Sequence, residues 1–235
     1  MSGPAARPAV LRPIDLRLDP EVRPLVRVAW LLAGPLSVEP SGAALRREVE
    51  EVSAGLVRRH AGRPPAAIDG LAAARELYRS FAIDPTRTRP SSEALLRRVL
   101  RGQPLPRISN AVDAGNLCSL LFLLPVGLFD VDRIRPPVTL RRGRAGETYT
   151  GIRKEAVHLA GRPVLCDAER PFGNPTSDSA DSAVGAATTR VWLTIFAPRS
   201  LPPEVLVAHT ATADELFRRH LAGSVPLETS RGVAD

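Results

Sequence analysis

Apolar and polar residues in the first half of the chain form one strand-like stretch and three stretches with helical spacing. Residues 22–34, VRPLVRVAWLLAG, combine valine, leucine and tryptophan in the way that is typical of a strand. A helix is predicted from Ser41, which is placed to cap its start, to Gly62, which is placed to end it. The same spacing predicts helices over residues 66–81 and 90–102.

The longest apolar run covers residues 117–129 and is interrupted only by Ser119, Pro125 and Gly127. Its 13 residues fall well short of the roughly 20 that span a bilayer, and the proline breaks it further. We therefore expect a buried element of the core and no membrane partner.

After this run the periodicity shortens, and five segments rich in β-branched residues are separated by glycine and proline, which predicts strands. These segments are residues 136–143, 147–152, 156–160, 162–168 and 189–198. Helical spacing returns over residues 202–223, and residues 224–235 read as a polar tail that frays. Helices followed by strands and a last helix favour one α+β domain over a repeating βαβ sheet.

The charge of the chain leaves two interpretations open. The 235 residues carry 32 Lys and Arg against 25 Asp and Glu, a net charge of +7 that is typical of proteins with a polyanionic partner. Only Lys154 is a lysine, and such an arginine excess is also what GC-rich coding would give. An arginine keeps its charge and its planar fork in either case, so phosphate binding is physically available.

Motifs for cofactor, metal and nucleophile chemistry are absent from the sequence. It has no GxxxxGK[ST], GxGxxG, HExxH or GxSxG pattern, and its four histidines are isolated, so we expect neither a cofactor nor a metal. Cys118 lies within the apolar run and is interpreted as a small core residue. Cys118 and Cys166 lack metal-ligand spacing, and the first ten residues lack a signal-peptide core, so we expect a cytoplasmic protein.

One connection between predicted strands is unusually polar. Residues 166–183, CDAERPFGNPTSDSADSA, place Asn174, Thr176 and Asp178 close together in the chain. So many hydrogen-bonding groups could line a small-ligand pocket. Asn-Pro and Ser-Asp sequences also make solvated turns for purely local reasons, and this second interpretation is the commoner one.

Five stretches in the same order carry a resemblance to a known family. They read RPSSEALLRRVLRG, LPRISNAVDAGNL, PVGLFDVDRI, GETYTGI and PFGNPTSDSA. Together they resemble the stand-alone relatives of the tRNA-binding editing domain, B3/B4, of the phenylalanyl-tRNA synthetase β-subunit. The resemblance implies a single α+β domain with mixed β-sheets flanked by helices, over residues 21–222, between an extension (residues 1–20) and a tail (residues 223–235). The parent domain binds the acceptor end of a charged tRNA and hydrolyses wrongly attached tyrosine.

Matching the family's site residue by residue shows three replacements. The family's site threonine corresponds to Gly115, its editing histidine to Gly127, and the glutamate that recognises a tyrosine hydroxyl to Thr194. Glycine has no side chain to orient a water, and threonine removes a charged acceptor. The resemblance therefore does not carry histidine-assisted hydrolysis or tyrosine specificity to this chain.

Two functions remain as hypotheses. The first is a tRNA-binding protein that hydrolyses mischarged aminoacyl-tRNA in trans, with a pocket that positions a water instead of a protein nucleophile. The second is a non-catalytic module that binds an amino acid or metabolite. Neither is a complete aminoacyl-tRNA ligase, and the catalytic residue stays unknown.

The candidate residues follow from the polar clusters, the matched family positions and the arginine excess, and we expect the polar ones to line a single cavity. For substrate binding they are Asn116, Gly127, Glu147, Asn174, Thr176, Asp178 and Thr194. For RNA binding they are Arg97, Arg98, Arg101, Arg141 and Arg142. The expected partners are tRNA and a small amino-acid-like ligand. We do not expect DNA to be a partner.

Overall fold

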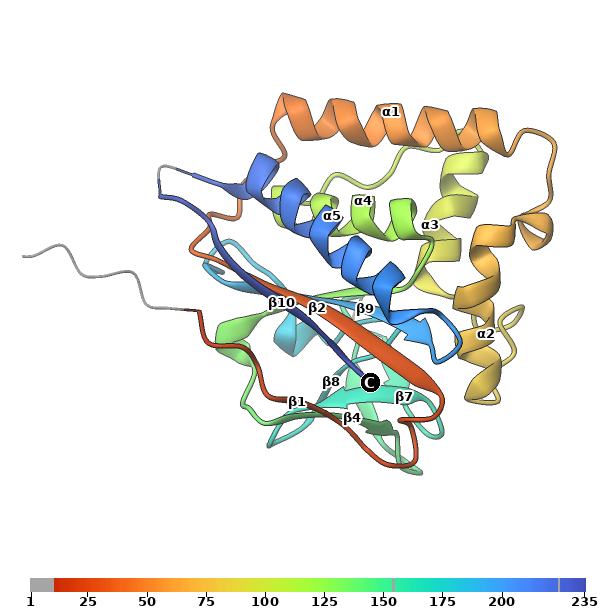
Figure 1. The fold of residues 1–235 in the computed structure, drawn as a ribbon, viewed down its shortest axis with the longest axis vertical. Helices are drawn as coiled ribbons and strands as arrows, with labels where there is room; N and C mark the ends of the chain where they lie inside the picture. Colours follow the sequence, from red (N-terminus) through yellow and green to blue (C-terminus); the bar gives the residue numbers. More distant parts are fainter. Residues whose placement is uncertain (1–10, 154, 224) are drawn as a thin grey trace, which may run out of the picture.

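Two β-sheets and a layer of helices are stacked on one another in the computed structural model, which describes residues 11–153, 155–223 and 225–235 (Figure 1). The larger sheet has the strand order β10-β2-β9-β3, and the smaller one the order β1-β4-β7-β8. Helices cover one face of the larger sheet, and the smaller sheet covers the other (Figure 1). The predicted α+β class is confirmed.

The larger sheet is antiparallel and supplies both halves of the core. It consists of β2 (Val26–Gly34), β3 (Val126–Asp130), β9 (Val191–Pro198) and β10 (Glu228–Ala234). All eight residues of β9 are buried, because it lies between β2 and β3 and is covered on both faces. Along it, Leu193 and Ile195 pack against the helices, whereas Trp192 and Phe196 pack toward the smaller sheet.

Five helices form the outer layer and one edge of the molecule. They are α1 (Ala43–Arg59), α2 (Ala72–Ser80), α3 (Ser91–Leu100), α4 (Asn110–Phe122) and α5 (Pro203–Leu221). The prediction that Ser41 caps the first helix is wrong. Gly42 holds the cap position, and the Ser41 hydroxyl donates to the Asp113 carboxylate at 2.5 Å instead. The first part of the helix predicted over residues 66–81 is two 3₁₀ turns, Pro65–Ala67 and Asp69–Leu71.

The apolar run at residues 117–129 is mostly buried, as expected, although Leu121 is 41% exposed, and the run is divided between two elements. Its first part completes α4, which ends where Leu123 adopts a left-handed conformation with φ of 53°. Its last part is the edge strand β3, which begins at Val126. A turn of three residues, closed by a hydrogen bond from Ser119 to the Leu124 carbonyl, joins the helix layer to the sheet.

The smaller sheet combines parallel and antiparallel pairs. It consists of β1 (Leu16–Leu18), β4 (Val138–Arg142), β7 (Pro163–Cys166) and β8 (Pro171–Gly173), with β1 parallel to β4 and the other pairs antiparallel. A separate two-stranded ribbon is formed by β5 (Thr148–Thr150) and β6 (Ala156–His158). Two further 3₁₀ turns cover Val131–Arg133 and Ala180–Ser182.

The expectation that residues 224–235 fray is wrong. Residues Glu228–Ala234 form β10, which pairs with β2 over seven residues, and Leu227 is buried in the core beneath the helices. Strand β1 also lies within the predicted N-terminal extension, although it pairs with β4. Both ends of the chain thus contribute strands that are paired with the strands between them.

Candidate functional site

The polar connection after β8 folds against the open edge of β3. Asn174 makes a local turn there, since its side-chain oxygen accepts the N–H groups of Thr176 (2.7 Å) and Ser177 (3.0 Å). Farther along, the Asp178 carboxylate accepts the N–H of Leu128 at 3.3 Å. Strand β3 pairs with β9 on its other side, so Asp178 satisfies a backbone donor at the sheet edge.

The Asp178 carboxyl lies in a poorly solvated position without a cationic partner. The side chain is partly buried, and among the described residues no lysine, arginine or histidine pairs with it. Burial raises the pKa of Asp178 to about 8, and the Leu128 hydrogen bond offsets only part of that rise. A carboxyl with this pKa can take up and release a proton near neutral pH.

Two of the replaced family positions face each other beside this carboxyl. Gly127 and Thr194 are direct partners in the β3–β9 pairing. A Cβ atom added at Gly127 would lie 2.9 Å from Oγ1 of Thr194 and 2.7 Å from Cζ of Phe129. One added at Gly173 would lie 2.5 Å from the same ring and 3.4 Å from Oδ1 of Asp178. The Phe129 ring therefore lies between two glycines, with Thr194 near one of them and Asp178 near the other.

Three buried polar atoms in this region have hydrogen-bonding capacity that the described protein groups do not use. They are Nδ2 of Asn174, Nε1 of Trp192 and Oγ1 of Thr194. Buried polar groups in folded proteins are nearly always paired, so three unpaired ones in the region of a carboxyl of raised pKa make this region the candidate functional site.

Two tyrosines hold the connection in place. The hydroxyl of Tyr78, on α2, shares a 2.8 Å hydrogen bond with the Thr176 hydroxyl. The hydroxyl of Tyr149, on β5, donates to the Ser177 carbonyl at 2.5 Å. Burial raises the pKa of both phenols well above its ordinary value, so both stay protonated. No motif in the sequence singled out these tyrosines, because their partners are 98 and 28 residues away.

The remaining predicted substrate-binding residues lie elsewhere. Asn116 lines a groove of about 250 Å³ between α1 and residues 102–107, together with Asp113. Glu147 is held by Arg141 in a two-pronged ion pair at 2.6 and 2.9 Å. Among the described residues, neither Asn116 nor Glu147 forms a hydrogen bond or ion pair with the group around Asp178, and a role in binding stays a prediction for both.

Gly115, the third replaced family position, is also separate from Gly127. A Cβ atom added at Gly115 would lie 3.6 Å from the Leu128 side chain. Leu128 packs toward the helices, whereas its neighbour Phe129 packs toward the smaller sheet. Gly115 therefore lies on the opposite face of β3 from Gly127.

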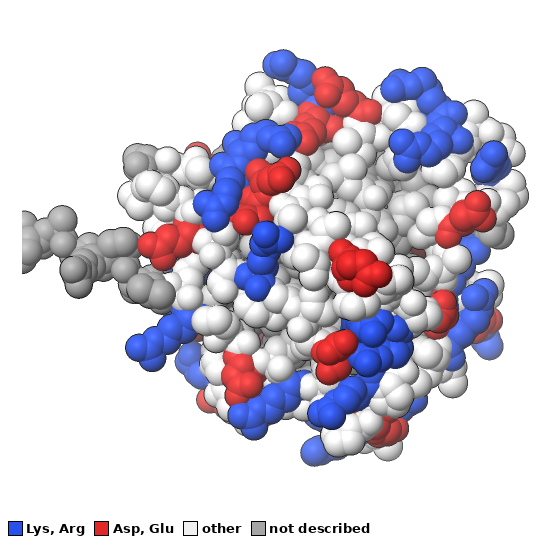
Figure 2. Space-filling model, viewed as in Figure 1, with Lys and Arg blue, Asp and Glu red and all other residues white. Residues whose placement is uncertain are grey.

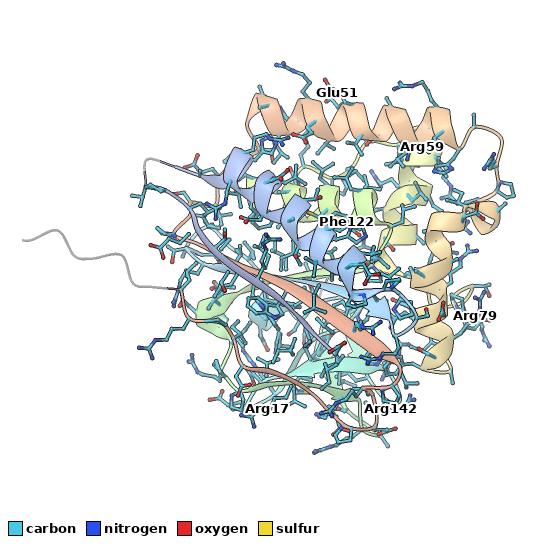
Figure 3. All side chains as sticks on the ribbon, viewed as in Figure 1. Arg17, Glu51, Arg59, Arg79, Phe122 and Arg142 are labelled. Atoms are coloured by element: carbon cyan, nitrogen blue, oxygen red, sulfur yellow. The ribbon has the colours of Figure 1, made fainter. Side chains whose placement is uncertain are left out.

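The five predicted RNA-binding arginines do not form one surface. Arg97, Arg98 and Arg101 lie at the end of α3 in the helix layer, whereas Arg141 and Arg142 lie on β4 on the other side of the larger sheet (Figures 1 and 3). Of these arginines, Arg101 is exposed and has no ion pair among the described residues.

The other four arginines are engaged within the protein. Arg97 pairs with Glu93, Arg98 donates to the Pro104 carbonyl, Arg141 pairs with Glu147 and Arg142 pairs with Glu21. Basic side chains without such partners gather over the end of α1, where Arg58, Arg59 and the nearby Arg63 are exposed (Figure 2).

Both cysteines are buried and free. Burial raises the pKa of Cys166 to about 11 and that of Cys118 further still. Neither thiol is therefore poised as a nucleophile. Across residues 11–153, 155–223 and 225–235, no three His, Cys, Asp or Glu side chains are grouped to hold a metal ion, and no helix is long and apolar enough to cross a membrane.

Comparison with known families places this region in a wider group of proteins. Residues 73–202, more than half of the chain, match the B3/4 domain. The chain belongs to the B3/4 domain family. Within the domain so defined lie α2, β3, β8 and β9, the elements that surround Asp178, whereas β1, β2, β10 and α1 lie outside the matched residues.

Among solved structures, the chain resembles an N-terminal fragment of the phenylalanyl-tRNA synthetase β-subunit from Pyrococcus horikoshii. The two share 14% sequence identity with a TM-score of 0.43, over 90% of this chain and 52% of the fragment. The chain thus spans about half the length of that fragment. A search of curated proteins finds no match.

Proposed function

We propose that this B3/4 domain binds the aminoacylated end of a tRNA and hydrolyses its ester bond in trans, with Asp178 as the group that transfers the proton. The observation that carries the proposal is the Asp178 carboxyl, which has a pKa of about 8 and no cationic partner among the described residues. We expect the reaction to take place in the cytoplasm.

The reaction needs one proton acceptor and donors for a developing negative charge. In its ionised form, the Asp178 carboxylate would remove a proton from a water molecule while the water oxygen attacks the ester carbonyl carbon. Nδ2 of Asn174 and Oγ1 of Thr194, which have no protein partner, would donate to the resulting oxyanion. The bond between this carbon and the ribose oxygen then breaks, and the ribose oxygen takes the proton from Asp178.

This assignment differs from the parent reaction at two positions that bear on specificity. Gly127 provides no imidazole, so proton transfer has to come from another group, and Asp178 is the titratable group beside it. Thr194 offers a neutral hydroxyl where the parent has a glutamate. We therefore do not expect tyrosine to be the preferred amino acid.

A second function, binding of an amino-acid-like ligand without hydrolysis, is favoured by one observation. Asp178 already accepts the Leu128 N–H, and this structural bond would explain the carboxyl without any catalytic role. In that case the unpaired polar atoms of Asn174 and Thr194 would bind the ligand directly.

The test is deacylation of a panel of tRNAs, each charged with a different amino acid. Wild type should accelerate hydrolysis of at least one ester, and Asp178→Asn should lose about 100-fold or more of that rate. Asp181→Asn is the matched control, because Asp181 lies in the same connection but is exposed and paired with Arg170. No hydrolysis of any ester, combined with binding of a free amino acid, would support the second function instead.

A further inference from the structure

One arginine beside the candidate site was not singled out by the sequence. Arg162 lies in the turn between β6 and β7, directly after Gly161, whose φ is +74°. Its backbone N–H donates to the Leu159 carbonyl at 2.9 Å, and its carbonyl accepts the Gly143 N–H at 2.8 Å. The backbone at this position is therefore held from both sides.

The Arg162 guanidinium has no acceptor among the described residues. The residue is partly buried, yet its side chain forms no ion pair and no hydrogen bond there. Arg141 and Arg142, on the adjacent strand β4, are by contrast paired with Glu147 and Glu21. A cation that loses part of its hydration normally gains a partner within the protein, so an unpaired one indicates an external anion.

The Arg162 guanidinium interacts electrostatically with both tyrosines of the site. Its positive charge acts on the phenols of both Tyr78 and Tyr149, where it opposes the rise in pKa caused by burial. The same two hydroxyls bind Thr176 and Ser177, which directly precede Asp178. Arg162 therefore lies on the tyrosine side of the connection that carries the carboxyl.

A second arginine strengthens the positive potential there. Arg142 donates to the Gly161 carbonyl at 3.0 Å, and its guanidinium lies 4.8 Å from the centre of the Phe81 ring at the end of α2 (Figure 3). Arg142 is itself paired with Glu21, whereas Arg162 is partly buried and has no partner among the described residues.

We propose that Arg162 binds a phosphate group of the terminal nucleotide of the RNA whose ester is hydrolysed at Asp178. This inference rests on the proposed function. The amino acid of an aminoacyl ester has no free carboxylate, so the nearest anion of such a substrate is the phosphate of the terminal nucleotide. A planar guanidinium with unused N–H groups fits two phosphate oxygens at once.

The experiment removes the phosphate from the ligand and the guanidinium from the protein in turn. The probes are adenosines that carry each amino acid of the deacylation panel through a stable 3′-amide, with and without a 5′-phosphate. For wild type, the phosphate should strengthen binding by about 10- to 100-fold. Arg162→Gln should bind both forms equally, at the affinity of the phosphate-free form, and Arg162→Lys should retain part of the preference.

Arg63→Gln is the control, because Arg63 also has no partner among the described residues but is exposed and follows α1 in the helix layer; it should keep the full preference. Equal binding of both probe forms by wild type would overturn the role of Arg162 and leave the hydrolytic site standing. Failure of wild type to bind any probe would overturn both proposals. A thermal melt of each variant verifies that the fold is kept.

Discussion

At the scale of single residues, the ionisation of Asp178 makes the stability of the folded protein depend on pH. Its pKa is raised in the folded protein to about 8, so the folded state holds a proton that the unfolded chain releases at lower pH. The stability that this proton contributes is present below the ordinary pKa of an aspartate and is lost as the pH rises through about 8.

Asp178→Asn should therefore stabilise the protein in alkaline solution. An asparagine oxygen can still accept the Leu128 N–H without carrying a charge. We expect a gain of about 1–3 kcal/mol at pH 9, which corresponds to roughly 2–10 °C in melting temperature, and no gain at pH 4. Melting curves of wild type and variant across this range test the prediction, and an equal difference at both pH values would contradict it.

We expect that any side chain introduced at Gly127 destabilises the protein, because it would collide with the Phe129 ring. The Cβ atom of Gly127→Ala would lie 2.7 Å from the Phe129 ring, so the ring must move out of a fully packed position. Denaturant unfolding should show a loss of about 1–3 kcal/mol. Gly185→Ala is the control, since a Cβ atom there meets nothing within 4 Å. Similar losses for both variants would contradict the packing argument.

The pairing of Gly127 with Thr194 agrees with the alignment of both positions to one site, because the family motifs define their place on β3 and β9. The setting of Asp178 could not be predicted in the same way. It depends on a strand edge 50 residues away, and a sequence does not tell which carboxyl will lose its solvent. The absence of a partner for the Arg162 side chain among the described residues could not be predicted from the sequence either, because ion pairs form only in the folded chain.

At the scale of elements, strand β10 corrects the prediction that the C-terminal residues fray. Its sequence, ETSRGVA, is mostly polar, and a polar stretch near a terminus reads as a fraying tail. An edge strand needs only backbone pairing with its neighbour, and β2 provides seven partners. The helices were largely predictable from their spacing. The boundary between helix and strand within the run at residues 117–129 could not be predicted, because a short apolar stretch fits a buried helix and a buried strand equally well.

Leu227→Ala tests whether this end of the chain is part of the fold. Leu227 is 3% exposed and packs in the core beneath the helices, so its truncation should cost about 2–5 kcal/mol of unfolding free energy. Val225→Ala, two residues earlier and 51% exposed, should cost less than about 0.5 kcal/mol. Denaturant unfolding measures both, and a neutral Leu227→Ala would mean that the end does fray.

At the scale of the whole molecule, most arginines are already committed to the protein's own carboxylates and carbonyls. Exposed arginines without a partner among the described residues are spread over the surface: Arg47, Arg58 and Arg59 on α1, the nearby Arg63, Arg79 on α2, Arg101 after α3, and Arg12, Arg23, Arg87, Arg144 and Arg153 elsewhere. Only part of the net charge of +7 is therefore free to meet an RNA backbone.

Binding of tRNA should weaken steeply with salt, because each neutralised phosphate releases condensed counterions. Arg101→Gln should reduce the slope of log affinity against log salt by about 0.7–0.9 if Arg101 contacts one phosphate. Arg141→Gln should mainly lower the melting temperature, since it removes the partner of Glu147. Filter binding at several salt concentrations gives the slopes, and salt-independent binding would exclude a phosphate interface.

The most direct test of the central claim is the pH dependence of deacylation by wild type and Asp178→Asn, after subtraction of spontaneous ester hydrolysis. Because Asp178 must be ionised to accept a proton, the wild-type rate should rise with pH and level off above about 8, and the rate of Asp178→Asn should be lower by about 100-fold or more and should not show this rise. Equal rates for the two proteins, or a wild-type rate that does not change between about pH 6 and 9, would contradict the assignment of Asp178 as the proton acceptor.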